Sequence, residues 1–507
     1  MRLAVLACWL AAATPLVAAG QQPPAPEVSV AQGRLAGALD DGMAVFRGIP
    51  YAAPPVGPLR WRPPQPGPTW SGTRDATAFG PACPQPTTRG LVARARLPQS
   101  EDCLTLNVWS PGLHPATPLP VMVWIYGGGF DAGAASVPLY DGAALAAHGV
   151  VVVTFNYRLG RLGFFALPAL AAEHPGEPFA NYGLMDQIAA LRWVRANVAA
   201  FGGDSGRVTI FGESAGGVSV DALMASPPAR GLFAGAISES GPVLFGTERL
   251  DDAERDASAV AARLGATGAD ALARLRALSA DSVIAGGSDL VALIVDGRVL
   301  DEDIAEAFAR GRIARVPYLT GTNSDEGSLL QGGDAAFLTR PLGDSLAAVR
   351  ALYERTGPIS DADFARALFN DQLFAASARL LAGFIARAGD SAWVYRFRFM
   401  PDLLRRRGAP GVPHGGELPF VFGFGRLAVF APEQDIAVER MVQAYWTDFA
   451  KTGDPNGADL PRWPAFRGPD PQTLVIADST AAVAGFRAAE IGVALRRWAR
   501  VTGLPLP

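Results

Sequence analysis

The sequence predicts an α/β fold, with a central and mostly parallel sheet flanked by helices. Three short apolar runs, at residues 121–126, 150–155 and 208–211, are typical of strands buried on both faces of such a sheet. Segments with helical spacing separate these runs, and alternation of strand and helix is characteristic of α/β proteins. The length of 507 residues would allow about three domains, but large α/β enzymes also reach it as one.

The first half of the chain supplies most of this alternation. Residues 27–47 alternate around turn residues at 33–35 and 41–42, which predicts hairpin strands. Residues 140–148 are Ala-rich and predict a helix. Apolar residues from Ile188 to Val198 follow helical spacing, which ends at Gly202 and Gly203. The run at 208–211 leads into a Gly-rich turn and then into an Ala/Val/Leu helix that ends before Pro227.

The second half adds strands and helical insertions. Residues 234–238, 316–320 and 393–399 are predicted strands. Residues 251–264, 269–278 and 344–390 have helical composition and fall between sheet elements, so we expect them to form the walls of a pocket. There is no internal repeat and no clear interdomain linker. We therefore predict a single domain over residues 20–507.

The N-terminus predicts export. Residues 1–19 combine one arginine, a short apolar run and small residues near Ala19, as secretory signal peptides do. Two alternatives are an uncleaved anchor helix, which Thr14 and Pro15 would interrupt, and a lipoprotein whose lipidated residue is Cys8. No later segment offers 18 uninterrupted apolar residues. We expect a secreted or periplasmic protein without a stable membrane anchor.

Composition excludes several functional classes. The net charge is −4, which gives no basic footprint for nucleic acid. Four histidines and three cysteines argue against a zinc ribbon or a dense disulfide scaffold. Removal of the signal peptide would leave Cys83 and Cys103, which an exported protein most simply pairs, although two free thiols are the alternative.

A nucleophile motif follows the third apolar run. Residues 212–216 read Gly-Glu-Ser-Ala-Gly and match G-x-S-x-G, between a predicted strand and a predicted helix, as a nucleophile elbow requires. Small neighbours permit the tight turn, and the helix N-terminus favours negative charge near Ser214. The glycines at 127–129 follow another strand, where their backbone N–H groups could approach a ligand. An ordinary serine and a plain Gly-rich loop are the structural alternatives.

Several separated segments together resemble the type-B carboxylesterases, the family of the cholinesterases and the bacterial para-nitrobenzyl esterases. The segments lie in family order at residues 46–57, 100–104, 126–130, 181–184, 211–216, 321–327 and 412–417. The resemblance spans nearly the whole mature chain. It implies an α/β-hydrolase fold and hydrolysis of small carboxylic esters through an acyl-enzyme, with no metal or cofactor.

The resemblance also assigns site residues. It places the catalytic triad on Ser214, Glu326 and His414. It places the oxyanion hole on Gly128, Gly129 and Ala215, the supporting positions on Glu213 and Ser240, and a disulfide on Cys83–Cys103.

Chain order supports the histidine independently. In α/β-hydrolases the order is serine, acid, histidine, and only His414 follows Ser214. The acid stays open at this point, because Asp325 and Glu326 are adjacent and spacing cannot choose between them. Glu213 could equally be a solvated or structural carboxylate.

Some features limit the resemblance. The segment between Cys83 and Cys103 holds no aromatic residue, whereas cholinesterases carry a choline-binding tryptophan there, so a choline ester is not expected. Phe245, Phe420 and Phe422 could line the substrate pocket or belong to the core. Lipase, amidase or specialised-ester activity on the same machinery, and an inactive adhesion or binding module, are the alternatives. Neither the substrate nor the oligomeric state follows from the sequence.

Overall fold

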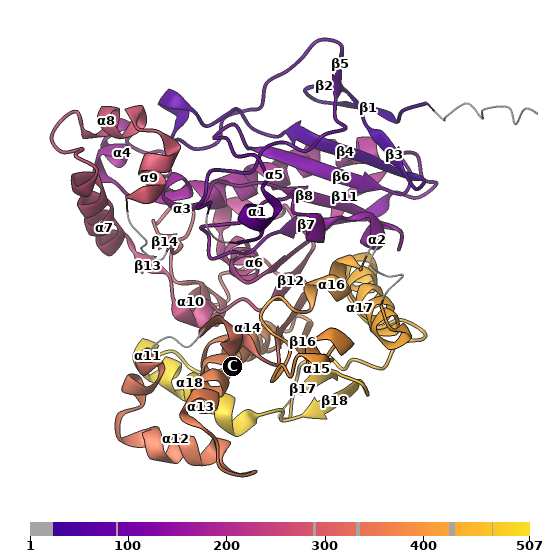
Figure 1. Cartoon of the computed structure of the whole chain (residues 1–507), viewed down its shortest axis with the longest axis vertical. Helices are drawn as coiled ribbons and strands as arrows, with labels where there is room; N and C mark the ends of the chain where they lie inside the picture. The colour runs from indigo at the N-terminus through magenta and orange to yellow at the C-terminus, as the bar shows by residue number, and fades with distance from the viewer. Residues whose placement is uncertain (1–23, 88–89, 287–290, 331–334, 425–430, 469) are drawn as a thin grey trace, which may run out of the picture.

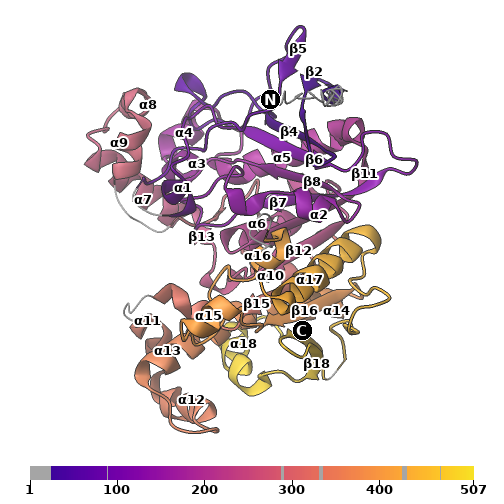
Figure 2. The same ribbon diagram turned by 45° about the vertical axis from the view of Figure 1, so that its right-hand side comes forward.

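A computed structural model of the chain describes residues 24–87, 90–286, 291–330, 335–424, 431–468 and 470–507 (Figure 1). The predicted signal peptide at residues 1–19 and the alternative lipoprotein cysteine at Cys8 lie outside the described residues. The centre of the described chain is an eleven-stranded sheet with the order β18-β17-β16-β15-β12-β11-β7-β8-β6-β4-β3. Figure 2 shows this sheet running through the whole molecule, from β4 near one end to β18 near the other.

Seven neighbouring strands in the middle of this sheet are parallel. They are β8 (Val151–Phe155), β7 (Leu119–Ile125), β11 (Gly203–Glu213), β12 (Gly235–Glu239), β15 (Tyr318–Asn323), β16 (Ala392–Phe397) and β17 (Gln472–Ile476). Every residue of β8, β12, β15 and β16 is buried, as expected for parallel strands with both faces covered. The predicted α/β-hydrolase architecture is confirmed, and six of these seven strands coincide with predicted runs.

The edges of the sheet are antiparallel. β3 (Ala38–Asp40), β4 (Met43–Pro50) and β6 (Thr105–Ser110) form one edge, and β18 (Ala481–Ala484) forms the other. The predicted N-terminal hairpins are confirmed as β1 (Glu27–Val30) with β2 (Gly33–Ala36), and as β3 with β4. The sequence patterns did not predict β6, β17 or β18.

Helices pack against the sheet in two groups. α2 (Ala143–Ala146), α16 (Leu418–Phe422) and α17 (Glu433–Thr452) lie together, as Figure 1 shows. α5 (Tyr182–Asn197), α6 (Ala215–Ala225), α10 (Ile304–Ala309) and α14 (Ala376–Arg387) form the other group. The helix predicted at 140–148 is shorter than expected, because a 3-10 turn at Pro138–Tyr140 precedes α2 and Gly149 has a positive φ.

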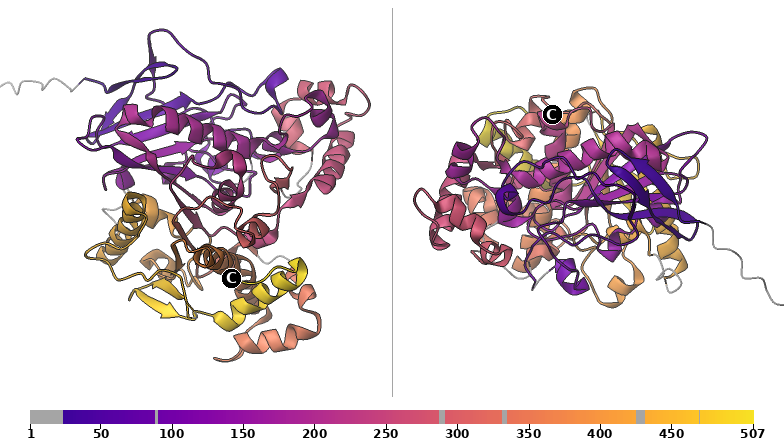
Figure 3. Two further views of the ribbon diagram at one scale, coloured as in Figure 1. Left: turned by 180° about the vertical axis from the view of Figure 1, so that it is seen from behind. Right: turned by 90° about the horizontal axis from the view of Figure 1, so that it is seen from above.

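The predicted insertions are helical and lie outside the sheet. One contains α7 (Leu250–Arg263), α8 (Ala271–Ala277) and α9 (Ala280–Ala285). The other contains α11 (Ala336–Thr339), α12 (Leu346–Tyr353) and α13 (Asp361–Phe369). Both project on the same side of the molecule in Figures 1 and 3. Among the described residues, no helix has both the length and the apolar character needed to cross a bilayer.

A disulfide closes the loop that contains α1 (Gly90–Ala95). Cys83 and Cys103 are bonded, with their Cα atoms 5.0 Å apart and both side chains buried. The predicted pairing is confirmed. In the chain-entropy model, closing a loop of 20 residues stabilises the fold by about 3 kcal/mol.

Candidate active site

Ser214 lies in a strained turn between β11 and α6. Its backbone dihedrals are φ 61° and ψ −123°, outside the common regions for a residue with a side chain. The glycines on either side are required by close packing. A Cβ on Gly212 would lie 2.6 Å from the Ile125 carbonyl oxygen, and a Cβ on Gly216 would lie 2.0 Å from it. The G-x-S-x-G spacing therefore permits this turn, as the elbow interpretation requires.

Glu326 is the acceptor at the centre of a buried hydrogen-bond network. Its Oε1 accepts from the Ser240 hydroxyl at 2.7 Å and from the backbone N–H of Asn323 at 2.6 Å. Its Oε2 lies 2.6 Å from Nδ1 of His414. The Glu326 side chain is fully buried. Charge-assisted bonds of this length fix both the carboxylate and the orientation of the ring.

The adjacent Asp325 points elsewhere. Its carboxylate pairs with the guanidinium of Arg366 on α13, and its backbone N–H donates to the carbonyl of Val412 at 2.8 Å. Partial burial raises the pKa of Asp325, an effect that the Arg366 guanidinium opposes. The structure thus brings the carboxylate of Glu326, and not that of Asp325, to the imidazole.

Glu213 contacts the far side of the imidazole. Nε2 of His414 lies 3.1 Å from Oε1 of Glu213, whose side chain is buried. Among the described residues, neither the Ser214 side chain nor Nε2 of His414 has a hydrogen-bond partner. A solvated role for Glu213 is therefore wrong.

The charges around His414 change its titration. Burial alone would lower the pKa of the imidazole, but the carboxylates of Glu213 and Glu326 outweigh it and raise the pKa above its ordinary value of 6.5. Burial raises the pKa of Glu213 to about 7, against the attraction of His414. Since these groups interact strongly, they titrate as one system.

Glycines form the wall opposite the serine. A Cβ on Gly127 would lie 2.4 Å from the Glu213 carbonyl oxygen and 2.9 Å from Cβ of Ser214, so this loop touches the elbow. Gly128 and Gly129 have φ of 112° and 65°. In the described chain, the backbone N–H groups of Gly128 and Gly129 donate to no protein acceptor. Ala215 is the first residue of α6, where N–H groups have no partner within the helix.

Several neighbours of this site were not predicted. Asn323 donates its side-chain amide to Glu417, whose pKa burial raises to about 8. The hydroxyl of Ser328 accepts from the backbone N–H of His414 at 3.0 Å. Phe374 packs edge-on against the imidazole, with ring centroids 5.4 Å apart. Asn323 and Glu417 lie in segments 321–327 and 412–417, which carry the family resemblance, whereas no sequence pattern indicated Ser328 or Phe374.

The sequence did not decide whether three phenylalanines line the pocket or belong to the core, and the structure shows that they differ in burial. Phe420 and Phe422 are core residues, with 1% and 2% exposure, whereas Phe245 is 56% exposed. Phe245 contacts the ring of Phe369, with centroids 6.1 Å apart, and Phe369 contacts Phe374 at 5.5 Å. No group of His, Cys, Asp or Glu side chains in the described ranges is arranged to hold a metal ion.

Comparison with known proteins decides the family. The sequence model of the carboxylesterase family matches residues 24–337 and 347–492. The chain belongs to the carboxylesterase family. The protein is a serine hydrolase that cleaves carboxylic esters, and the family resemblance found in the sequence is confirmed.

The similarity to individual relatives extends over most of each chain. The chain is 38% identical over 460 residues to a fumonisin B1 esterase of Sphingopyxis macrogoltabida, and the match covers 84% of this chain and 82% of the relative. It is 38% identical to the para-nitrobenzyl esterase of Bacillus subtilis, covering 89% of this chain and 94% of that one. A solved structure of a thermophilic para-nitrobenzyl esterase matches with a TM-score of 0.81 and 36% identity, covering 92% of this chain and 99% of that one.

Proposed function

We propose that Ser214 is the nucleophile of this carboxylesterase, with His414 as general base and Glu326 as the acid that orients it. The observation that carries this assignment is the hydrogen-bonded series Ser240–Glu326–His414 beside the strained elbow. Glu326 accepts from Nδ1–H and so leaves Nε2 as the basic nitrogen.

The reaction proceeds in two halves. Nε2 of His414 takes the proton from Ser214 Oγ while Oγ attacks the ester carbonyl, and the resulting imidazolium protonates the leaving alkoxide. His414 then takes a proton from water as the water oxygen attacks the acyl carbonyl. The acyl–Oγ bond breaks, the imidazolium returns the proton to Ser214 Oγ, and the carboxylic acid leaves. Because Nε2 contacts Glu213 in the free protein, we propose that substrate binding moves this contact to Ser214, since catalytic hydrogen bonds often tighten only in the complex.

The oxyanion of each tetrahedral intermediate needs donors. We propose the backbone N–H groups of Gly128, Gly129 and Ala215, because the Gly127 loop abuts the elbow and the first two have no protein acceptor in the described chain. Losing one such donor typically costs about 3 kcal/mol in the barrier.

We also propose that the chain is exported after cleavage of residues 1–19, and that residues 20–507 act as one catalytic domain. The buried Cys83–Cys103 bond supports an oxidising compartment. The single sheet, shared by strands from both ends of the described chain, supports one domain.

Replacement of the nucleophile tests the central assignment. Ser214→Ala should lower kcat on para-nitrophenyl acetate by about six orders of magnitude, because the residues of a triad act as a unit. An organophosphate should label Ser214 in the wild type, as shown by peptide mass spectrometry. Ser226→Ala controls for the loss of a serine hydroxyl, since Ser226 is fully buried and has no place in the site. Turnover within tenfold of wild type in Ser214→Ala would overturn the assignment.

A further inference from the structure

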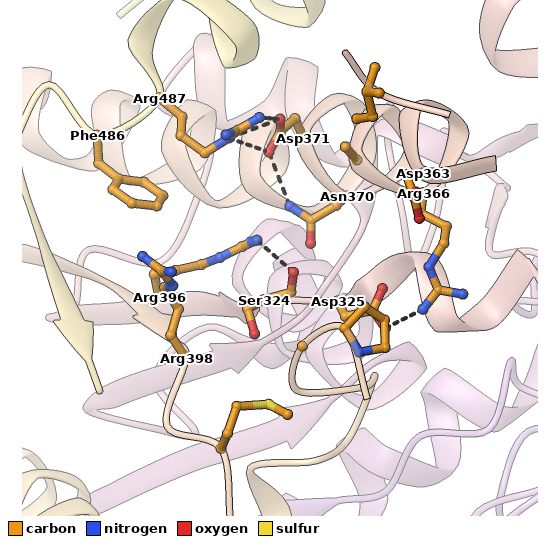
Figure 4. A pocket seen from close by; sticks show the side chains of 15 residues that line it. Ser324, Asp325, Asp363, Arg366, Asn370, Asp371, Arg396, Arg398, Phe486 and Arg487 are labelled. Atoms are coloured by element: carbon orange, nitrogen blue, oxygen red, sulfur yellow. Dashed lines mark hydrogen bonds and ion pairs between the residues drawn. The ribbon is translucent and has the colours of Figure 1, made fainter. Parts of the chain in front are cut away.

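A polar cavity is lined in part by Ser324 and Asp325, the two residues before Glu326. It has a volume of about 480 Å³, within the range of cavities that hold small organic molecules. Figure 4 shows charged side chains from several elements converging on it. They come from β16, the end of β15, α13, the π-helical turn Asn370–Ala375 and the residue before α18 (Ala488–Thr502).

The lining charges do not balance locally. Four arginines and three aspartates line the cavity: Arg366, Arg396, Arg398, Arg487, Asp325, Asp363 and Asp371. Two ion pairs neutralise four of these charges, since Arg366 pairs with Asp325 and Arg487 contacts both oxygens of Asp371. The remaining two arginines have no carboxylate partner in the described chain.

Arg396 is a buried cation with an unused donor. Its side chain belongs to a residue only 6% exposed, and its guanidinium donates to the hydroxyl of Thr322 at 2.8 Å and to the carbonyl of Ser324 at 3.1 Å. Its Nε has no hydrogen-bond partner. Burial lowers the pKa of Arg396 to about 10, which still leaves it charged at neutral pH. Its direct hydrogen-bond partners are neutral, and the carboxylates of Asp371 and Glu326 compensate its charge only from a distance. A buried guanidinium without a paired anion is costly.

Arg398 supplies a second free guanidinium two residues away. Its side chain lines the same cavity, is exposed, and has no partner in the described chain. Residues two apart along an extended segment project to the same side, which places both cations on one wall. Asp363 opposes them at the rim, where it accepts from the Ser360 hydroxyl at 2.7 Å.

We propose that this cavity binds a small organic anion carrying two or more carboxylate groups, held by Arg396 and Arg398. Planar guanidinium groups match carboxylates with paired N–H donors, and two such groups favour a polyvalent anion over a monovalent one. The volume favours an organic molecule over a single inorganic ion. This site is separate from the ester-cleaving site and does not depend on the roles proposed for Ser214 and His414.

Citrate is the probe for the test, with inorganic phosphate in a parallel titration. Isothermal titration calorimetry on the full chain at low ionic strength should show citrate binding in one-to-one ratio, with weaker binding of phosphate. Arg398→Gln should weaken citrate binding roughly tenfold, the loss of one charge-assisted contact, and Arg398→Glu should weaken it further. Arg398→Lys should retain more affinity than Arg398→Gln.

Controls separate this site from general surface charge. Arg467 is also exposed, lies outside the cavity and has no partner in the described chain, so Arg467→Gln and Arg467→Glu should bind citrate as the wild type does. The thermal midpoint without citrate shows whether each variant is folded. Since Arg398 is exposed, its replacement should keep the fold. Absence of citrate binding to the wild type, equal losses in the Arg467 variants, or tighter binding of phosphate than of citrate would overturn the proposal.

Discussion

The two faces of the loop that joins β15 to its following 3-10 turn (Glu326–Leu330) carry opposite charge. On one face, the carboxylates of Glu213, Glu326 and Glu417 gather around a single imidazole. On the other, arginines outnumber aspartates around an open cavity (Figure 4). Asp325 and Glu326, adjacent residues with the same functional group, point to different faces. Each carboxylate therefore takes its role from the side chain that it contacts, Arg366 for Asp325 and His414 for Glu326, and not from its residue type.

Replacement of Glu326 or Asp325 by its amide tests this comparison, and the loss of kcat/KM in Glu326→Gln is the largest effect that we expect from it. Glu326→Gln should lower kcat/KM by about 10³ to 10⁴, because the amide cannot stabilise the imidazolium and favours the wrong tautomer. Asp325→Asn should lower it by less than about tenfold, because it removes only a partly exposed ion pair with Arg366. Steady-state kinetics on a para-nitrophenyl ester measure both. Equal losses in the two variants would remove the distinction between the faces.

A smaller loss of activity is expected at Ser240, which is one hydrogen bond away from Glu326. Its hydroxyl donates to Oε1 of Glu326 at 2.7 Å in a fully buried position. Ser240→Ala removes one hydrogen bond to a charged group, worth about 1.5–3 kcal/mol, so kcat should fall roughly 10- to 100-fold. Ser240→Thr, which keeps the hydroxyl, should recover part of the loss. An unchanged kcat in Ser240→Ala would show that this donor does not support the acid.

The sequence predicted the parallel core because buried parallel strands appear as continuous apolar runs. β7 and β8 are such runs, and β11 ends in one at residues 208–211, whereas β17 has only three consecutive apolar residues, Leu474–Ile476. The elbow was predictable because close packing demands glycine at 212 and 216. Chain order was sufficient to select the histidine.

Other features depend on contacts between distant segments. Asp325 and Glu326 could not be told apart by spacing, because their directions depend on Arg366 and His414, 41 and 88 positions further along the chain. The cavity lined by Arg396 and Arg398 could not be predicted from the sequence for the same reason. Its two unpaired arginines lie in one strand segment, but the cavity exists only where β15, α13 and the start of α18 meet. Short-range patterns predict elements, and the tertiary fold decides which charges become neighbours.

The smallest effect expected is a displacement of the pH profile by Glu213. The sequence alone predicts loss of rate below about pH 6.5, the ordinary pKa of histidine. In the structure, the Glu213 carboxylate lies 3.1 Å from Nε2 of His414 and is one cause of its raised pKa. The catalytic form is the neutral imidazole, so a raised pKa moves the loss of rate to higher pH. Glu213→Gln removes the negative charge, lowers the pKa of His414, and should move the acidic limb of kcat/KM down by about one pH unit.

The direction of this displacement is the informative result. Because the pKa of Glu213 is itself raised to about 7, the wild-type limb reports the coupled pair. Protonation of Glu213 weakens the hold on the imidazolium proton, so the limb should be broader than a single titration. Glu248→Gln is a matched control, since burial also raises the pKa of Glu248 but the residue lies away from the imidazole. Its acidic limb should coincide with that of the wild type. If Glu213→Gln moved the limb upward, or left it in place, then Glu213 would not stabilise the imidazolium, and that role would belong to Glu326 and Glu417.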